Sequence, residues 1–261
     1  IVARRFQIVH LRMGREVIEV TTFRGHHDDS SQQASRSEDG MLLRDNVYGT
    51  LETDAMRRDF TVNALYYTLK DFSVIDYCKG VEDLKNRTLR MIGDPATRYK
   101  EDPVRILRAL RFAAKLGFNI DPKTAKPISE LGNLLLNVSD ARLFEEVLKL
   151  FLGGSATATF NLLREHDLLL HLFPGTDAAL KANDELGANL IEQCMINTDK
   201  RIRADKTVTP AFIYAALLWP ALQQQFKLLS GQMTLAQAWA QAGTNVINQQ
   251  LTRTAIPKRF L

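Results

Sequence analysis

The sequence has little cysteine and no long apolar run, and both absences narrow the class of protein. Its 261 residues include two cysteines, Cys78 and Cys194, whose wide separation fits neither a disulfide framework nor a zinc site. A membrane-spanning helix needs a run of about 18 apolar residues, which the chain does not contain. The first residues lack both Met and the apolar core of a signal peptide. We therefore expect a cytoplasmic protein whose two ends both lie within a longer one.

The charge of the chain is mildly basic and unevenly distributed. Hydrophobic residues make up 45% and charged residues 25%, as in ordinary soluble globular proteins, and the formal net charge is +4. Lysine and arginine are dense in residues 57–115 and sparse in residues 223–250. A basic segment favours an anionic partner, although many enzymes that never bind nucleic acid are equally basic.

Hydrophobic periodicity predicts a small α/β part followed by a long helical part. Residues 6–11 and 16–23 are rich in β-formers and flank Gly14, which indicates a hairpin. The polar residues 26–40 are expected to form a surface loop. A helix is expected at residues 51–69, and short strands at 73–77 and 89–92. Helical patterns then cover residues 102–116, 123–135, 140–152, 156–168, 185–203, 209–229 and 234–250. The predicted fold class is α+β, mainly α.

Residues 57–64 (RRDFTVNA) are the first segment whose composition suggests chemistry. On a helix, Asp59 and Asn63 would lie four residues apart and face the same way. Arg57 and Arg58 suit a triphosphate, because guanidinium binds phosphate with fork geometry, whereas Asp59 and Asn63 suit ribose hydroxyls. The alternative is an ordinary helix start with Asp59 as a solvated cap.

Residues 101–112 (EDPVRILRALRF) predict a capped helix with one basic face. Asp102 and Pro103 form an N-cap and first-turn pair. At about 100° per residue, Arg105 falls on the same side as three later basic residues, which are Arg108, Arg111 and Lys115. The Asp102 carboxylate can accept from an exocyclic amine, and the Arg105 guanidinium can donate to the adjacent ring nitrogen. Adenine and cytosine both present this pair of groups. The alternative is an amphipathic helix with a solvated basic face.

Glu19 is a carboxylate within the second predicted strand, on the same face as Val17. It is either a functional acid in a cleft or a solvated residue on an exposed sheet face. The sequence leaves both interpretations open.

Four segments in the observed order resemble the superfamily of class II CCA-adding enzymes and bacterial poly(A) polymerases. Residues 57–64 are similar to its ribose-selecting motif, and residues 76–84 (DYCKGVEDL) to its hinge motif. Residues 101–108 match its base-recognition motif, which includes Glu101 and Arg108. Residues 141–146 (ARLFEE) stand where the superfamily has a helix beside the nucleotide pocket.

Two further segments resemble the polymerase branch more than the CCA-adding branch. Residues 1–11 are similar to a Gly-Arg-Arg-Phe stretch that ends in His, with Ala3 in place of the glycine. Residues 42–50 (LLRDNVYGT) also look like the polymerases.

The resemblance implies an enzyme that adds AMP from ATP to RNA 3′ ends with Mg²⁺. It implies Asp59 and Glu19 as catalytic residues, and residues 57–59, Asn63 and the 101–108 motif as nucleotide-binding residues. Arg111 and Lys115 are then expected to bind RNA. It also implies part of a palm domain in residues 1–92, a helical neck in 93–152, and an RNA-binding body in 153–261.

One feature of the superfamily is missing from the sequence. No aspartate in the chain has another aspartate two positions on, whereas the superfamily holds its metal ions with an Asp-x-Asp segment. We expect that segment upstream of residue 1. The alternatives are a CCA-adding enzyme, or an RNA-binding relative that kept the pocket and lost the metals.

Overall fold

The computed structural model describes residues 8–25, 48–182 and 185–260. The predicted loop at residues 26–40 lies outside this range. The two polymerase-like segments, residues 1–11 and 42–50, lie mostly outside it. The described residues form two compact units. Unit 1 comprises residues up to 105 together with 119–125, and unit 2 comprises residues 106–118 and 126 onward.

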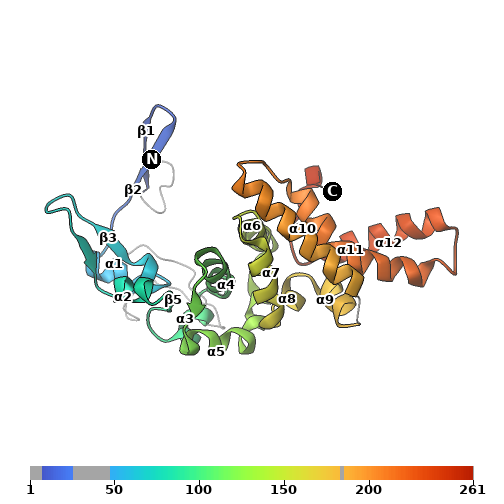
Figure 1. Ribbon diagram of the computed structural model, residues 1–261, viewed down its shortest axis with the longest axis horizontal. Coiled ribbons are helices and arrows are strands. Elements are labelled where there is room, and N and C mark those ends of the chain that lie inside the picture. The colour runs from blue at the N-terminus through green and yellow to red at the C-terminus, as the bar shows by residue number, and fades with distance from the viewer. Residues whose placement is uncertain (1–7, 26–47, 183–184, 261) are drawn as a thin grey trace. The chain divides into compact units, whose positions relative to one another are not determined.

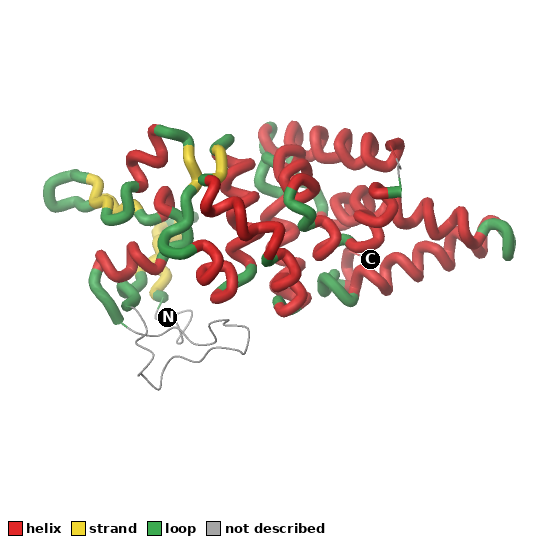
Figure 2. The backbone as a smooth tube through the Cα atoms, turned by 90° about the horizontal axis from the view of Figure 1, so that it is seen from below, coloured by secondary structure: helices red, strands yellow, loops and turns green. Residues whose placement is uncertain are grey.

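Every strand among the described residues belongs to unit 1, whereas unit 2 is helical (Figure 2). The expected class, α+β and mainly α, is therefore confirmed. None of the helices in the described part of the chain is long and apolar enough to cross a membrane.

The expected hairpin at the start of unit 1 is confirmed, and residues 6 and 7 of its first predicted strand lie outside the described range (Figure 1). Strands β1 (Val9–Met13) and β2 (Glu16–Val20) pair antiparallel. Gly14 takes a φ of 64° in the turn, a left-handed conformation that glycine adopts at little cost. All ten strand residues are exposed.

The prediction of a helix at residues 51–69 is confirmed for its first two turns and wrong after them. Helix α1 (Leu51–Arg57) begins with a capping box at Thr50 and ends at Arg57. A short 3₁₀ turn, η1 (Thr61–Asn63), leads into β3 (Leu65–Tyr67). β3 pairs with β4 (Val74–Asp76), close to the strand predicted at 73–77. Tyr66 and Tyr67 favour a strand, because aromatic side chains pack well across a pleated pair.

The remaining elements of unit 1 surround a small core. They are α2 (Gly80–Lys85), β5 (Thr88–Leu89), α3 (Pro95–Glu101) and β6 (Asn119–Ile120), which pairs parallel with β5. The periodicity did not predict α3, although Asp94 caps its N-terminus and Pro95 occupies its first turn. Phe60, Leu89 and Tyr99 are fully buried in this unit.

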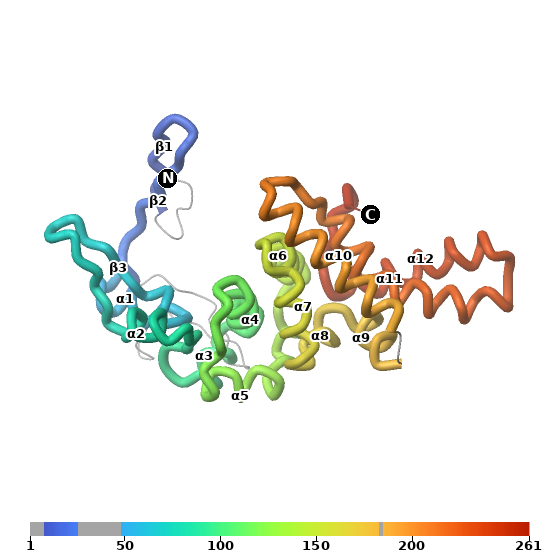
Figure 3. Tube along the Cα trace, viewed as in Figure 1, coloured from blue at the N-terminus to red at the C-terminus, as the bar shows by residue number. Residues whose placement is uncertain are grey.

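Unit 2 is an array of helices whose predicted positions are largely confirmed (Figure 3). Helix α10 (Glu185–Arg203) spans the predicted residues. Helices α8 (Leu169–Leu172) and α9 (Pro174–Lys181) were not predicted. Helices α4 and α5 each cross the boundary between the units. The other helices are α4 (Val104–Leu116), α5 (Pro122–Glu130), α6 (Asp140–Phe151), α7 (Ala156–Glu165), α11 (Pro210–Leu229) and α12 (Leu235–Leu251), with 3₁₀ turns η2 (Gly132–Asn137) and η3 (Lys258–Phe260).

Candidate nucleotide-binding site

Glu101 is the centre of a buried charge cluster in unit 1. It is the last residue of α3 and is 8% exposed. Its Oε2 accepts hydrogen bonds from Arg98 Nη1 at 2.8 Å and from Arg105 Nη1 at 2.9 Å. A buried carboxylate is tolerated only when it is paired, and the two guanidinium groups supply that pairing for Glu101.

Arg98 joins this cluster to the predicted ribose motif. Its Nη2 donates to the backbone carbonyl of Arg57 at 2.6 Å and to that of Arg58 at 2.8 Å. Burial is the main cause that lowers the pKa of Arg98, followed by the nearby charge of Arg105. The sequence analysis missed Arg98. The available signal was its spacing, since it precedes Glu101 by three residues and can meet it on one helix face.

Asp59 and Asn63 meet, although not on the helix that the sequence predicted. Asp59 follows the end of α1, and η1 turns the chain back toward it. Asp59 Oδ1 accepts from Asn63 Nδ2 at 3.1 Å and from the backbone N–H of Phe60 at 2.9 Å. Asp59 is 8% exposed, so it is not the solvated cap of the alternative interpretation.

Arg58 is held by a second buried carboxylate, Asp54. Arg58 donates from Nε at 3.1 Å and from Nη2 at 2.9 Å, both to Asp54 Oδ2, and Tyr66 Oη donates to the same oxygen at 2.6 Å. The backbone N–H of Arg24 donates to Asp54 Oδ1 at 3.1 Å. Burial of Asp54 raises its pKa, but the hydrogen bonds from Tyr66, Arg24 and Arg58 outweigh burial and leave it lowered. Burial and the bond to Asp54 raise the pKa of Tyr66 to about 12.

Asp102 and Arg105 lie at the start of α4. Asp102 Oδ1 accepts from the backbone N–H of Val104 at 3.3 Å, which is a capping contact. Arg105 Nη1 donates to the backbone carbonyl of Arg98 at 2.8 Å as well as to Glu101. Both residues are partly buried. Arg105 is therefore part of the Glu101 cluster and not of a solvated basic face.

The hinge-like segment is bonded directly to the ribose motif. Thr61 Oγ1 donates to Asp83 Oδ2 at 2.7 Å. Asp76 accepts from three backbone N–H groups at 2.9–3.0 Å, which include that of Gly80. A Cβ at Gly80 would lie 2.3 Å from the carbonyl oxygen of Thr61, so the close approach of the two segments requires glycine.

Glu19 is exposed to solvent, unlike the carboxylates of these buried clusters. Its side chain is 67% exposed, and its Oε1 lies 3.1 Å from Nε2 of His10 on the paired strand. Among the described residues no group of three His, Cys, Asp or Glu side chains is placed to hold a metal ion. One exposed carboxylate does not make a Mg²⁺ site, because a hard cation needs several clustered oxygens.

The remaining predicted residues belong to unit 2. The Cζ atoms of Arg108 and Arg111 lie 5.2 and 4.9 Å from the centre of the Phe112 ring, and Lys115 is exposed. The helix expected from residues 141–146 is α6, where buried Glu146 accepts from Lys149 Nζ at 2.8 Å. The basic residues of α4 thus fall into two environments, a buried cluster at Arg105 and a more open one at Lys115.

Two family models match the chain. Residues 1–90 match the model described as the Poly A polymerase head domain. The contacts of Asp54, Asp59 and Asp76 lie within this range. Residues 117–180 match a model described as the probable RNA and SrmB-binding site of polymerase A. These matches agree with the division into an N-terminal α/β part and a helical part.

Curated relatives match the full chain at high identity. The chain is 48% identical over 266 residues to Poly(A) polymerase I of Escherichia coli O6:H1, with 100% of this chain and 57% of that protein covered. It is 45% identical to Poly(A) polymerase I of Haemophilus influenzae, of which it covers 58%. The CCA-adding enzyme of Lactobacillus helveticus is 37% identical over 63% of this chain. The chain spans less than two thirds of the length of these relatives.

Solved structures share the fold at lower identity. The Bacillus stearothermophilus CCA-adding enzyme in complex with CTP has a TM-score of 0.56 and 23% identity, and the match covers 97% of this chain and 69% of that one. A tRNA nucleotidyltransferase complexed with a primer tRNA and an incoming ATP analog has a TM-score of 0.54 and 22% identity, with coverage of 95% and 80%.

Proposed function

Because the chain belongs to the superfamily of bacterial poly(A) polymerases and class II CCA-adding enzymes, we propose that the full-length protein adds AMP from ATP to RNA 3′ ends without a template. The observation that carries the proposal is the Arg98–Glu101–Arg105 cluster, which joins the ribose-motif backbone to the base-recognition residues. A preorganised nucleotide pocket needs this kind of buried support. The product would serve RNA processing and decay.

Within this function, residues 57–63 bind the sugar and the triphosphate. Arg57 and Arg58 contact phosphate oxygens, and Asp59 with Asn63 contacts ribose hydroxyls. The support is that Asp54 Oδ2 accepts two hydrogen bonds from Arg58 while Tyr66 donates to the same oxygen, which fixes the Arg58 guanidinium before a ligand arrives. A fixed guanidinium loses less entropy on binding phosphate than a mobile one.

Asp102 and Arg105 read the base, together with Glu101 and Arg108 of the same motif. Asp102 accepts from the exocyclic amine of adenine and Arg105 donates to the adjacent ring nitrogen. Both hydrogen bonds given above for Arg105 use Nη1, so they set the plane of the guanidinium without using Nη2. Cytosine offers the same donor–acceptor pair, and the depth of the pocket must exclude it.

A Mg²⁺ pair would supply charge neutralisation at the triphosphate and activation of the RNA 3′ oxygen. The described residues do not fit a metal site, so we assign its carboxylates to a segment outside them. Asp59 and Glu19 are proposed as catalytic carboxylates that assist this centre. Residues 1–92 would be part of the palm, 93–152 the neck and 153–261 the RNA-binding body of a cytoplasmic enzyme.

The test is to incubate the full-length protein with RNA, Mg²⁺ and each nucleoside triphosphate separately. Repeated incorporation of AMP into varied RNA 3′ ends is the expected result. Addition limited to cytidine and one adenosine on tRNA ends would instead identify a CCA-adding enzyme. RNA binding without any incorporation would identify a non-catalytic relative.

A further inference from the structure

Helices α4 and α6 and the loop that follows α6 border a groove in unit 2, here called the α4–α6 groove. Its volume is about 420 Å³, within the roughly 300–1,000 Å³ of sites that hold small molecules. It is lined by Arg111, Phe112, Lys115, Glu145, Leu148, Lys149, Leu152, Gly153 and Ser155.

The lining combines an apolar surface with positive charge. Phe112, Leu148 and Leu152 are each partly exposed, so they present apolar area that the fold itself does not cover. Lys115 and Lys149 are exposed on the same groove. An apolar surface beside clustered cations matches a nucleotide, whose base is flat and apolar and whose phosphate is anionic.

Two contacts organise the cations. Arg111 Cζ lies 4.9 Å from the centre of the Phe112 ring, an arrangement that offers aromatic and guanidinium planes for stacking. Lys149 Nζ lies 2.8 Å from Oε1 of Glu146, a buried carboxylate of the preceding helical turn. Three cationic side chains line the groove against Glu145, and Glu146 offsets part of the charge of Lys149, so the balance stays positive and favours anions.

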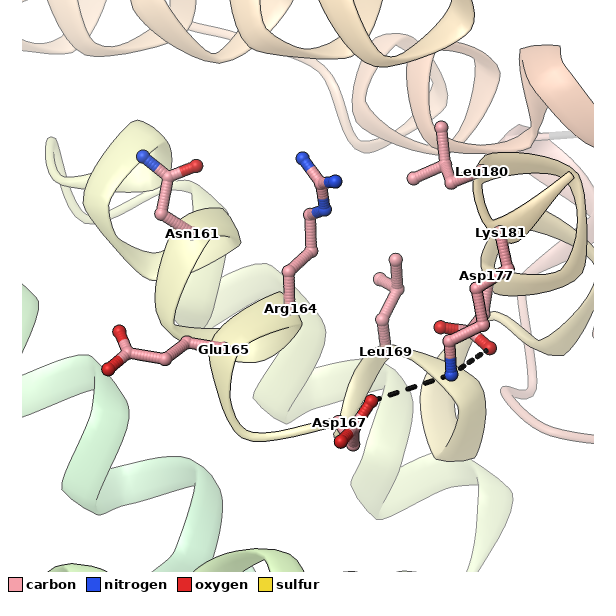
Figure 4. A pocket seen from close by; sticks show the side chains of 8 residues that line it. All are labelled: Asn161, Arg164, Glu165, Asp167, Leu169, Asp177, Leu180 and Lys181. Atoms are coloured by element: carbon pink, nitrogen blue, oxygen red, sulfur yellow. Dashed lines mark hydrogen bonds and ion pairs between the residues drawn. The ribbon is translucent and has the colours of Figure 1, made fainter. Parts of the chain in front are cut away.

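A second pocket of unit 2 shows the opposite balance of charge. It is lined by Arg164 and Lys181 together with three carboxylates, those of Glu165, Asp167 and Asp177. Lys181 forms ion pairs with Asp167, at 3.4 Å, and with Asp177, at 3.1 Å, which are drawn as dashed lines in Figure 4. Phosphate would be repelled there, so a nucleic-acid strand is better matched by the α4–α6 groove.

We propose that the α4–α6 groove binds one nucleotide of the single-stranded RNA substrate. The base lies against Phe112, Leu148 and Leu152, and Lys115 and Lys149 contact a backbone phosphate. This subsite rests on the proposed function, because it assumes an RNA substrate. It extends RNA binding beyond Arg111 and Lys115 to residues of α6.

The first experiment measures the affinity of the full-length protein for a fluorescent oligoadenylate over a series of salt concentrations. Lys115→Gln and Lys149→Gln should each weaken binding roughly threefold or more at low salt, and lower the log–log salt slope by about 0.7. Glu145→Gln should tighten binding, because it removes the one repulsive charge. The matched control is Lys227→Gln, which removes an exposed charge of α11 outside the groove and should change neither quantity.

The second experiment tests the apolar part of the groove. Phe112→Leu keeps an apolar side chain but removes the ring, and should weaken oligoadenylate binding about fivefold or more. Its melting temperature separates loss of stacking from loss of fold. The KM for RNA in AMP incorporation should rise.

The outcomes separate the subsite from the proposed function. Wild-type affinity and salt slope in all four groove variants, with AMP incorporation intact, would overturn the subsite and leave the function standing. Absence of AMP incorporation by the wild-type protein would overturn the function instead. Stronger competition by an acidic peptide than by unlabelled oligoadenylate would show that the groove serves a protein partner, and would also overturn the subsite.

Discussion

The two units hold their basic residues in contrasting ways. In unit 1 the guanidinium groups of Arg58, Arg98 and Arg105 are bonded to buried carboxylates or to backbone carbonyls. In the α4–α6 groove of unit 2, Lys115 and Lys149 are exposed, although Lys149 also pairs with buried Glu146. Fixed charges suit selection among similar small ligands, whereas mobile exposed charges suit a polymer backbone whose sequence varies.

The contrast also predicts where substitutions damage the protein. Removing one partner from a buried charge network leaves the other partner charged and unpaired, which strongly destabilises the folded protein. Removing exposed Lys115 mainly changes affinity and its salt dependence. Removing Lys149 also takes the ion-pair partner from buried Glu146. Substitutions in the buried charge networks of unit 1 should therefore change stability and nucleotide chemistry together, and Lys115→Gln in the groove should change RNA binding alone.

The largest effect is expected for Arg98→Ala. It removes one guanidinium partner of buried Glu101 and releases the carbonyls of Arg57 and Arg58. Unfolding in urea should show that the free energy of unfolding falls by about 3–5 kcal/mol. AMP incorporation should fall as well. Arg201→Gln is the control, because that arginine is exposed and bonds only a loop carbonyl in the contacts described, that of Thr207. A loss below about 1 kcal/mol for Arg98→Ala would show that the cluster is not the support described here.

Gly80→Ala should be the next most damaging change. The new Cβ would meet the Thr61 carbonyl at 2.3 Å, and a forced backbone shift costs about 1–3 kcal/mol. Gly243→Ala in α12 is a matched control with no atom within 4 Å, and it should stabilise the protein by about 0.5–1 kcal/mol. Opposite signs of the two changes in thermal unfolding support the contact between hinge-like segment and ribose motif. Equal signs would argue against it.

Acid should destabilise unit 1 through Asp54. Its pKa in the folded protein is lowered from the ordinary 3.8, so its stabilising contribution is present above that value and is lost as pH falls through the folded pKa. Asp54→Asn should cost about 1–3 kcal/mol at neutral pH, and less as the pH is lowered below about 4. A free-energy difference between wild type and variant that stays constant with pH would mean that the Asp54 carboxylate is not tied to folding.

The sequence predicted much of the fold because the helices of unit 2 have strong apolar periodicity, as α10 shows. The prediction was wrong at residues 58–69, where the sequence pattern is helical but the chain forms a turn held by tertiary contacts. There the backbone of Thr61 bonds to the carbonyl of Arg90, a contact that no local pattern encodes. Helices α8 and α9 were missed for a similar reason, because short helices gain their stability mainly from packing.

Part of the candidate site could be predicted, and part required coordinates. The spacing of Asp59 and Asn63 predicted that they face the same way on a helix. They do meet, but a 3₁₀ turn and not an α-helix brings them together. Asp54, Tyr66 and Arg98 were not predicted, because their roles depend on partners from other segments. A sequence motif can reveal the side chains that contact a ligand. It reveals less well the residues from other segments that hold those side chains in place.

The central claim is that Asp102 and Arg105 read the base, and its most direct test is the ratio of ATP to GTP incorporation by Asp102→Asn in the full-length enzyme. Asn caps a helix about as well as Asp, so the melting temperature should not change. Loss of the carboxylate acceptor should lower the ratio about tenfold to a hundredfold, whereas Lys115→Gln should leave it unchanged. An unchanged ratio in Asp102→Asn with unchanged stability would contradict the claim, because Asp102 would then serve only as a helix cap.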